Sequence, residues 1–431
     1  MALASVAAVG LAAALSAAPA EAAHAGRAQV GRSLLVASAL PNALHPLPNV
    51  GNNAYLGGVW CETATSCWAV GGYGKANGAI VNQALYWNGR KWSLTHAANP
   101  AGTRPADNNL LTNVSCASRQ TCWAVGEEFG YSGPVVAEAL RWTGTRWSAV
   151  HIPRPVGLAH DGVYLLSGIS CPAPGECWAV GGYVNGQHGV NQILRWNGTR
   201  WSEVPVPNPG GSASSAFSGL SAVTCASTRN CWAVGGYSVL HPRRVGRSQA
   251  LHWNGRRWAL VATPQLGGAT NVSNFLASAS CIAPDNCWAV GDYLTAFATG
   301  ASRSQTLHWN GTKWSAVSVP QPDGTGRGSV NSLTAVSCTS ASNCWAAGYY
   351  GGLRTATAVG RNQTVHWNGK KWALMPSPDP IGTAHGDDNL LSGISCAAEA
   401  SCWAVGTGVP KTGISRDQAL RWNGITWSGY R

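Results

Sequence analysis

The chain has 431 residues, a net charge of +12 at pH 7, and charged residues at only 11% of its positions, well below the roughly 25% of an average globular protein. Glycine is abundant (53) and phenylalanine scarce (4), which is typical of a turn-rich β protein. A basic balance can indicate an anionic partner. The sequence contains no helix-turn-helix, zinc-finger or RNA-recognition motif, so nucleic acid is disfavoured as that partner.

Residues 1–25 have the features of an export signal. Residues 2–18 are small or apolar and carry no charge, and residues 20–22 and 23–25 both fit a small-x-small cleavage site. The alternative is an uncleaved membrane anchor, for which the run is only marginally long. No later stretch is apolar enough to cross a bilayer. We therefore expect a secreted or extracellular protein without a membrane span after cleavage.

Residues 26–50 form a proline-containing lead-in to a repeat that fills residues 51–431. Within the lead-in, Ser33–Ala37 is a candidate strand for closing a ring of repeats.

One phrase recurs seven times in residues 51–431: Cys-x5-Cys-Trp, followed later by Trp-Asn-Gly-x-x-Trp or a close variant. Three tryptophans in each copy account for 21 of the 22, and Trp60 is the extra one. A period of 54 to 58 residues indicates one supersecondary unit stacked seven times. The cysteine pairs use all 14 cysteines: Cys61 and Cys67, Cys116 and Cys122, Cys171 and Cys177, Cys225 and Cys231, Cys281 and Cys287, Cys338 and Cys344, Cys396 and Cys402.

The cysteine pattern predicts disulfides. An even count at fixed spacing in an exported chain is typical of a disulfide framework. Structural zinc sites use tighter Cys-x2-4-Cys pairs, so we expect no metal and no other cofactor.

Four short runs in each copy predict β-strands, here named A to D. In the third copy they are Leu166–Cys171, Cys177–Gly181, Gln192–Trp196 and Arg200–Val204, bounded by Gly, Asn, Pro or Ser. The Asn-Gly between strands C and D is a strong hairpin signal, and no segment shows a sustained helical period. We therefore predict an all-β, seven-bladed β-propeller with four antiparallel strands and one Cys-x5-Cys hairpin disulfide per blade.

The third copy, Cys177–Tyr183 followed by Leu194–Trp201 and Pro205–Pro207, resembles the Kelch repeat. The Gly-x-x-Trp element resembles the Asp-box of sialidase-type propellers, although Trp196 stands where that box has its aspartate. The second glycine of the Kelch-like Gly-Gly pair is replaced in four copies, by Glu127, Asp292, Tyr349 and Thr407. The whole chain looks most like exported tandem Cys/Trp-repeat proteins of actinobacterial type. These resemblances imply the propeller fold and carry no catalytic residue across.

The B–C and D–A connections are longer and more varied than the A–B and C–D turns, and an up-and-down blade places them together on one face. Varied loops on a rigid scaffold are the usual place for binding sites, so we predict the functional face there. The alternative is that the polar residues of the B–C and D–A loops are only solvated loop tips. The ligand-binding candidates are Asp107, Asn108, His241, Arg243, Arg244, Arg247, Arg354 and Arg361, and the catalytic candidates are His160, Asp161, His385, Asp387 and Asp388.

Two recurrent polar features have their own interpretations. The glutamine that precedes strand C occurs in six of the seven copies, with Glu138 in its place in the second, and this recurrence predicts a structural hydrogen bond to a loop. The cations of the C–D turns either contact an anionic envelope or protect the sheet edges. They are Arg90, Lys91, Arg146, Arg200, Arg256, Arg257, Lys313, Lys370 and Lys371.

These observations favour a monomeric, exported binding module that recognises an extracellular glycan, an anionic cell-envelope polymer or a protein through the loop face. The alternative is a polysaccharide hydrolase or lyase that uses the His and Asp residues of the D–A loops. A third reading is a scaffold whose rims contact partner proteins. The enzyme readings are weakened because the sequence has no unpaired cysteine, no intact Asp-box, no Gly-x-Ser-x-Gly and no His-Glu-x-x-His.

Overall fold

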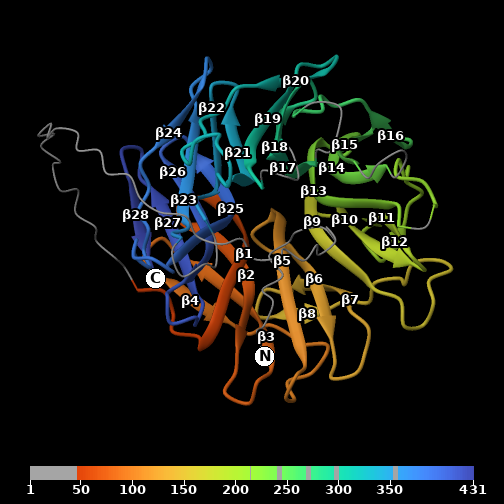
Figure 1. Ribbon diagram of the computed structural model, residues 1–431. Coiled ribbons are helices and arrows are strands. Elements are labelled where there is room, and N and C mark those ends of the chain that lie inside the picture. Colours follow the sequence, from red (N-terminus) through yellow and green to blue (C-terminus); the bar gives the residue numbers. More distant parts are fainter. Residues whose placement is uncertain (1–45, 214, 240–244, 268–272, 296–299, 353–357) are drawn as a thin grey trace, which may run out of the picture.

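The computed structural model describes residues 46–213, 215–239, 245–267, 273–295, 300–352 and 358–431. These residues form 28 strands and no helix. Seven groups of four consecutive strands stand around a central axis (Figure 1), so the predicted seven-bladed propeller is confirmed. No helix within the described ranges has the length and apolar character that a bilayer crossing requires.

The blades follow one another in chain order. Blade 1 is β1 (Asn52–Thr63), β2 (Ser66–Gly74), β3 (Ile80–Trp87) and β4 (Trp92–Thr95). Blade 2 is β5 (Asn108–Ser118), β6 (Thr121–Phe129), β7 (Val136–Trp142) and β8 (Trp147–Ala149). Blade 3 is β9 (Tyr164–Ala173), β10 (Glu176–Asn185), β11 (His188–Trp196) and β12 (Trp201–Glu203). Blade 4 is β13 (Phe217–Ser227), β14 (Asn230–Val239), β15 (Val245–Trp253) and β16 (Trp258–Val261).

The last three blades repeat this order. Blade 5 is β17 (Ser273–Ala283), β18 (Asn286–Leu294), β19 (Ser302–Trp309) and β20 (Trp314–Val317). Blade 6 is β21 (Asn331–Ser340), β22 (Asn343–Tyr350), β23 (Arg361–Trp367) and β24 (Trp372–Met375). Blade 7 is β25 (Asp388–Ala398), β26 (Ser401–Val409), β27 (Arg416–Trp422) and β28 (Trp427–Tyr430).

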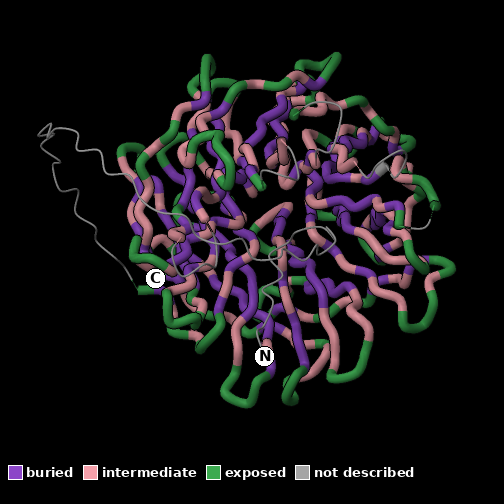
Figure 2. Tube along the Cα trace, viewed as in Figure 1, coloured by how far each residue is buried: buried purple, intermediate pink, exposed green. Residues whose placement is uncertain are grey.

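Within each blade the four strands pair antiparallel in sequence order, from an inner strand A to an outer strand D (Figure 1). Blades 3 to 7 are separate sheets, whereas one parallel pair, Ile80 with Asn108, joins blades 1 and 2 into a single eight-stranded sheet. The strand-A members of neighbouring blades contact one another around the whole ring. Buried residues fill the interior of the blades and exposed residues gather at the turns (Figure 2).

Each predicted disulfide is present between strands A and B. Cys61 lies directly opposite Cys67 in the ladder, and the other six pairs bond in the same way, with no free cysteine in the described chain. Structural disulfides of this kind indicate an oxidising environment.

We expect the double substitution Cys281→Ala and Cys287→Ala to lower the free energy of unfolding by about 2 kcal/mol, since closing a seven-residue loop removes that much entropy from the unfolded chain. Urea unfolding of the variant and the parent checks this. An unchanged unfolding midpoint would mean that the hairpin holds without its bond.

A ring of tryptophans joins the blades. The strand-B tryptophan of each blade lies 4.6 to 4.8 Å from the strand-C tryptophan of the next blade, centroid to centroid, and 5.0 to 5.2 Å from its strand-D tryptophan. The second contact is edge to face, an arrangement that the ring quadrupoles favour. The tryptophans are therefore packing groups between blades.

A second set of contacts between blades is polar. At five of the seven interfaces the hydroxyl residue before the first cysteine accepts a hydrogen bond from the cysteine N–H of the next blade, as Ser115 does from Cys171 at 3.1 Å. The recurrent glutamine makes structural hydrogen bonds in most copies, but Gln249 Nε2 donates to strand carbonyls, those of Gly219 and Gly236, each at 2.9 Å, rather than to a loop. The same amide exchanges two bonds with Asn191 of the previous blade, both 3.0 Å. The amide of Gln192 is buried without a hydrogen-bond partner.

In the described part of the chain, blade 7 closes onto blade 1 by the same contacts, and its four strands β25–β28 are consecutive in the sequence. Trp403 packs against Trp87 and Trp92, and Cys61 N–H donates to Ser395 Oγ at 2.9 Å. From the lead-in, buried Leu47 donates its N–H to the Arg431 carbonyl at 2.8 Å. The ring-closing strand predicted at Ser33–Ala37 lies outside the described residues, as does the signal at residues 1–25.

Candidate functional site

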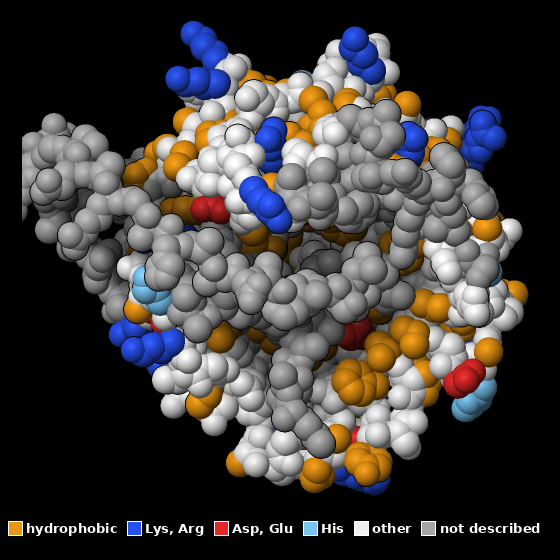
Figure 3. Space-filling view, viewed as in Figure 1, with side chains coloured by type: hydrophobic (Ala, Val, Ile, Leu, Met, Phe, Trp, Pro, Cys, Tyr) orange, Lys and Arg blue, Asp and Glu red, His pale blue; other side chains and the backbone are white. Residues whose placement is uncertain are grey.

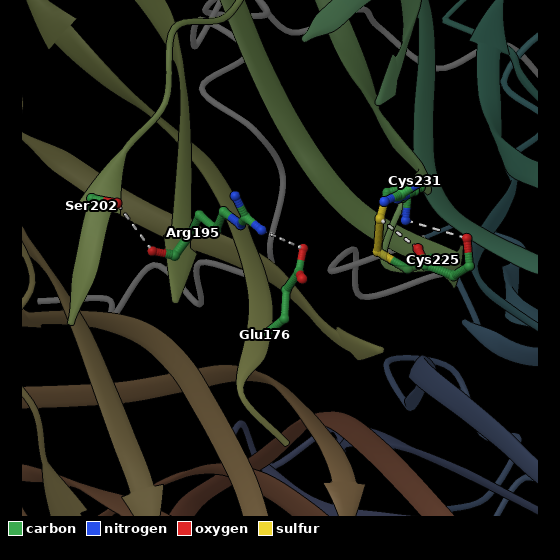
Figure 4. A network of polar contacts seen from close by, with 7 residues as sticks. Glu176, Arg195, Ser202, Cys225 and Cys231 are labelled. Atoms are coloured by element: carbon green, nitrogen blue, oxygen red, sulfur yellow. Dashed lines mark hydrogen bonds and ion pairs between the residues drawn. A yellow bond between two sulfur atoms is a disulfide. The ribbon is translucent and has the colours of Figure 1, made fainter. Parts of the chain in front are cut away.

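In every blade, one side chain of strand C covers the strand-B tryptophan of the same blade. This residue directly precedes the strand-C tryptophan and is Tyr86, Arg141, Arg195, His252, His308, His366 or Arg421. In several blades this covering residue forms an ion pair or a hydrogen bond with the residue before the second cysteine. Glu176 forms an ion pair with Arg195 at 3.2 Å (Figure 4), and Asn343 Oδ1 lies 2.6 Å from His366 Nε2. These pairs are structural covers for the tryptophans.

Burial against the tryptophans lowers the pKa of the three covering histidines, His252, His308 and His366. Because loss of hydration disfavours the charged ring, these histidines are neutral covers at physiological pH.

Blade 1 departs from this pattern by presenting three aromatic side chains in a row. Trp60 is directly opposite Trp68 in the ladder, and Trp68 is directly opposite Tyr86. Directly opposed residues project from the same face of a sheet, and the rings of Trp68 and Tyr86 are 4.9 Å apart. In the other blades the first position holds Ser or Thr and the third holds Arg or His. The row faces blade 2, because Trp68 packs against Trp142 and Trp147.

A cleft of about 690 Å³ opens between blades 1 and 2 at this row. Its lining includes Trp68, Tyr86 and Thr95 of blade 1 and Arg119, Gln120 and Trp142 of blade 2. Arg119 and Gln120 are the two residues of the β5–β6 turn, so the cleft lies on the face that carries the A–B and C–D turns. Arg119 Nη2 donates to Tyr86 Oη at 2.9 Å, and Ser66 Oγ lies 3.2 Å from the same oxygen.

One tryptophan of this cleft is more open than its counterparts. Trp142 is partly exposed, whereas most strand-C tryptophans are buried. Trp68 lines the cleft but is buried, with 3% of its surface exposed. Trp142 and the half-buried Tyr86 therefore supply the accessible aromatic surface of the cleft.

Two further departures from the repeat occur in blade 2, of which Thr143 lines the cleft and Glu138 does not. Thr143 replaces the turn asparagine, and Glu138 replaces the strand-C glutamine. Glu138 is buried and accepts hydrogen bonds from Asn82 Nδ2 at 2.8 Å and from Leu110 N–H at 3.1 Å. Desolvation raises the pKa of this carboxyl well above its usual range, although the two hydrogen bonds act in the opposite direction. The departures from the repeat thus converge on one interface.

On the loop face, the polar residues of two D–A connections bond to the backbone of their own loop or of a neighbouring segment. Asp107 Oδ2 accepts the Arg104 N–H at 2.8 Å, and Asn108 Nδ2 donates to the Ala106 carbonyl at 2.7 Å. In blade 7, Asp387 accepts the N–H groups of Ala384 and Lys411, each at 3.0 Å. Asp388 Oδ1 accepts the Gly360 N–H at 3.1 Å. All four side chains are buried, which supports a structural role, and binding or catalysis by them stays a prediction.

The remaining loop-face candidates lie apart from one another. His160 and Asp161 are exposed in the loop before β9, and His385 is exposed in the loop before β25, so they serve blades 3 and 7. Arg247 lies within β15, and Arg361 is the exposed first residue of β23. His241, Arg243, Arg244 and Arg354 lie outside the described residues. Within the described ranges, no group of three or more His, Cys, Asp or Glu is placed to hold a metal ion.

The cleft was not predicted from the sequence. Its signals were present as single anomalies, namely the extra Trp60, the aromatic Tyr86 among Arg and His, and Thr143 in place of asparagine. Asn109 and Asn389 were also missed. Each is buried and fastens its D–A loop, as Asn109 does by accepting the Ala101 N–H at 3.0 Å and donating to the Gly102 carbonyl at 2.9 Å.

No protein-family model matches the sequence, and no curated protein matches it either.

Solved structures do match the fold. An ulvan lyase, from a new family of polysaccharide lyases, is 9% identical, with the match covering 90% of this chain and 94% of the lyase at a TM-score of 0.51. A GH74 xyloglucanase from Xanthomonas campestris is 13% identical at a TM-score of 0.48; the match covers 88% of this chain but only 55% of the xyloglucanase. At these identities the likeness concerns the fold alone, and the class of protein is an all-β, seven-bladed, disulfide-bonded propeller.

Proposed function

We propose that the protein is an exported binding module that recognises an extracellular glycan in the cleft between blades 1 and 2. The observation that carries this proposal is the aromatic row Trp60, Trp68 and Tyr86, which occurs in one blade of seven and of which Trp68 and Tyr86 line the cleft. Flat rings offer apolar surface to the C–H face of a sugar, while Tyr and Trp also supply hydrogen-bonding groups. A mostly apolar cavity with a few polar groups is the usual form of a ligand site.

The choice of a glycan over the other partners that the sequence allowed, a cell-envelope polymer or a protein, rests on this row and on the concave shape of the site. The ulvan lyase acts on a polysaccharide, which agrees with the choice at the level of the fold only. Binding through the B–C and D–A loop face is less well supported, because Asp107 and Asn108 are engaged within their own loop.

The alternative function, a polysaccharide hydrolase or lyase, would use His160, Asp161, His385, Asp387 and Asp388. It is less well supported because the two groups lie in loops that lead into different blades and because Asp387 already accepts two backbone hydrogen bonds.

Export, a Kelch-like or Asp-box-like ancestry, an actinobacterial-type origin and a monomeric state belong to the same proposal. Export is supported by the signal-like residues 1–25 and by seven disulfides, since disulfides persist in oxidising compartments.

The test is a glycan array with the purified protein, followed by calorimetric titration of the glycans that bind. We expect Tyr86→Ala to weaken binding at least about tenfold, equivalent to about 1.4 kcal/mol, with little change in unfolding. The matched control is His252→Ala, which removes the covering side chain at the same repeat position of blade 4, where it lies 4.6 Å from Trp232. Equal losses in both variants, or release of products from a polysaccharide, would reject the proposal.

A further inference from the structure

The turn face of the molecule carries many cations that have no carboxylate partner. Among the described cations of this face, Arg195 forms an ion pair with Glu176. The nine cations of the C–D turns, from Arg90 to Lys371, are all exposed. Figure 3 shows Lys and Arg side chains standing out at several places around the periphery. We infer that the glycan bound in the cleft is an anionic polysaccharide, an inference that rests on the proposed function.

Arg119 supplies a cation at the cleft itself. Its side chain is exposed at the β5–β6 turn, and one of its N–H groups is used by Tyr86 Oη. A guanidinium has five N–H donors in a planar fork that matches a carboxylate or a sulfate, so the others remain for a ligand lying on the aromatic row. Glu62 is the carboxylate within electrostatic reach of Arg119.

The C–D turns that flank the cleft add further positive charge. Arg90 and Lys91 follow β3 of blade 1, and Arg146 precedes β8 of blade 2. The turn geometry is fixed, because Asn88 Oδ1 accepts the N–H groups of both Arg90 and Lys91 at 3.0 Å. The same double acceptance recurs in other blades, at Asn254 and Asn368 for example. The cations are therefore presented at regular intervals around the rim.

Protection of the sheet edges does not account for these cations. The edge strand of each blade is its short outer strand: β4, β8, β12, β16, β20, β24 or β28. Charged residues that protect an edge lie on the edge strand itself. At the outward position of three edge strands the residues are Leu94, Leu260 and Leu374, which are 44 to 46% exposed. The cations instead occupy the turns before those strands, where a long polyanion crossing the turn face would meet them. The carboxylates of the A–B turns, Glu62, Glu176, Asp285 and Glu399, are fewer.

The probes are polygalacturonate as a carboxylated chain, dextran sulfate as a sulfated chain and dextran as a neutral chain. We expect both polyanions or one of them to bind at 150 mM salt and dextran not to bind. Arg119→Ala should weaken binding at least about tenfold, whereas Tyr86→Phe, which releases Arg119 but keeps ring and charge, should weaken it less than about threefold. Arg90→Ala with Lys91→Ala should cost about three- to tenfold.

The matched control for the rim is Lys370→Ala with Lys371→Ala, the same turn positions in blade 6 across the ring, for which we expect less than a twofold loss. Equal losses from the two rim pairs, with no effect of Tyr86→Ala, would overturn the inference in favour of diffuse charge attraction. Binding of a neutral glycan that depends on Tyr86 but not on Arg119 would also overturn it, while leaving the proposed function intact.

Discussion

Replacing Trp403 with alanine is expected to lower the free energy of unfolding by about 3 to 5 kcal/mol, the range for removing a large aromatic side chain from a core. Trp403 is fully buried in blade 7, and its ring centroid lies 4.8 Å from that of Trp87 and 5.0 Å from that of Trp92, both in blade 1. Tyr430 lies 4.9 Å away on the last strand. The substitution therefore removes the main apolar contact that closes the ring.

The matched control is Trp232→Ala, which empties the same position between blades 4 and 5, where Trp232 contacts Trp309 and Trp314. Urea unfolding should give similar losses for the two variants. Hydrogen exchange should distinguish the two variants. Blades 4 and 5 are consecutive in the chain, whereas blades 7 and 1 are held together by non-covalent contacts, which only Trp403→Ala weakens. Faster exchange confined to blades 7 and 1, above all to β3, β4 and β28, is the expected result. The same exchange pattern in both variants would show that Trp403 has no special part in closure.

The sequence predicted most of the fold because its signals are local and repeated. The Cys-x5-Cys spacing sets the A–B hairpin, and Asn-Gly sets the C–D hairpin, so two of the three turns in a blade are marked by their own residues. The lengths of the turns between strands B and C were less well predicted. In blade 3 the strands run on to a two-residue turn, Gly186–Gln187, with Asn185 paired to His188, although a longer loop was expected.

The candidate site was harder to predict, because it depends on which side chains of one blade meet those of the next. Tyr86 is 33 residues from Arg119 in the sequence and adjoins Arg119 and Trp142 only after blade 2 packs on blade 1. The loop candidates present a different difficulty. Composition cannot tell an aspartate that points to solvent from one such as Asp387, which accepts N–H groups of neighbouring segments.

Asp417 provides the second large effect, and it is a gain in stability. It occupies the position before the strand-C glutamine, where blades 1, 3 and 6 have Asn82, Asn191 and Asn362. Gln83 Nε2 donates to Asp417 Oδ2 at 2.5 Å, but Asp417 Oδ1 and Gln83 Oε1 are buried without partners. Desolvation raises the pKa of Asp417 to about 7, against the effect of the Gln83 hydrogen bond.

The direction of the pH effect follows from this raised pKa. An aspartate in the unfolded chain has a pKa of about 3.9, so the folded state binds the proton more tightly and the carboxyl opposes folding once it must ionise. Its contribution is favourable at acidic pH and is lost progressively as the pH rises from about 4 through about 7. Between pH 5 and pH 8 this loss amounts to about 2 to 3 kcal/mol.

Asp417→Asn is therefore expected to stabilise the protein, and its advantage over the parent should grow by about 2 to 3 kcal/mol from pH 5 to pH 8. The new amide can exchange two hydrogen bonds with Gln83, as Asn362 does with Gln418 at 3.1 and 3.2 Å. Urea unfolding of both proteins across this pH range measures the difference, in which the titration of His252, His308, His366 and the other carboxyls cancels.

The reciprocal substitution, Asn362→Asp, places an aspartate at the same position between blades 6 and 7, where Asn362 Nδ2 now donates to the Pro378 carbonyl at 2.9 Å. We expect it to destabilise the protein more at pH 8 than at pH 5. A pH-independent difference in both variants would mean that Asp417 is ionised in the folded protein at pH 5. In that case the interface between blades 7 and 1 would have to supply the buried carboxylate with a donor other than Gln83.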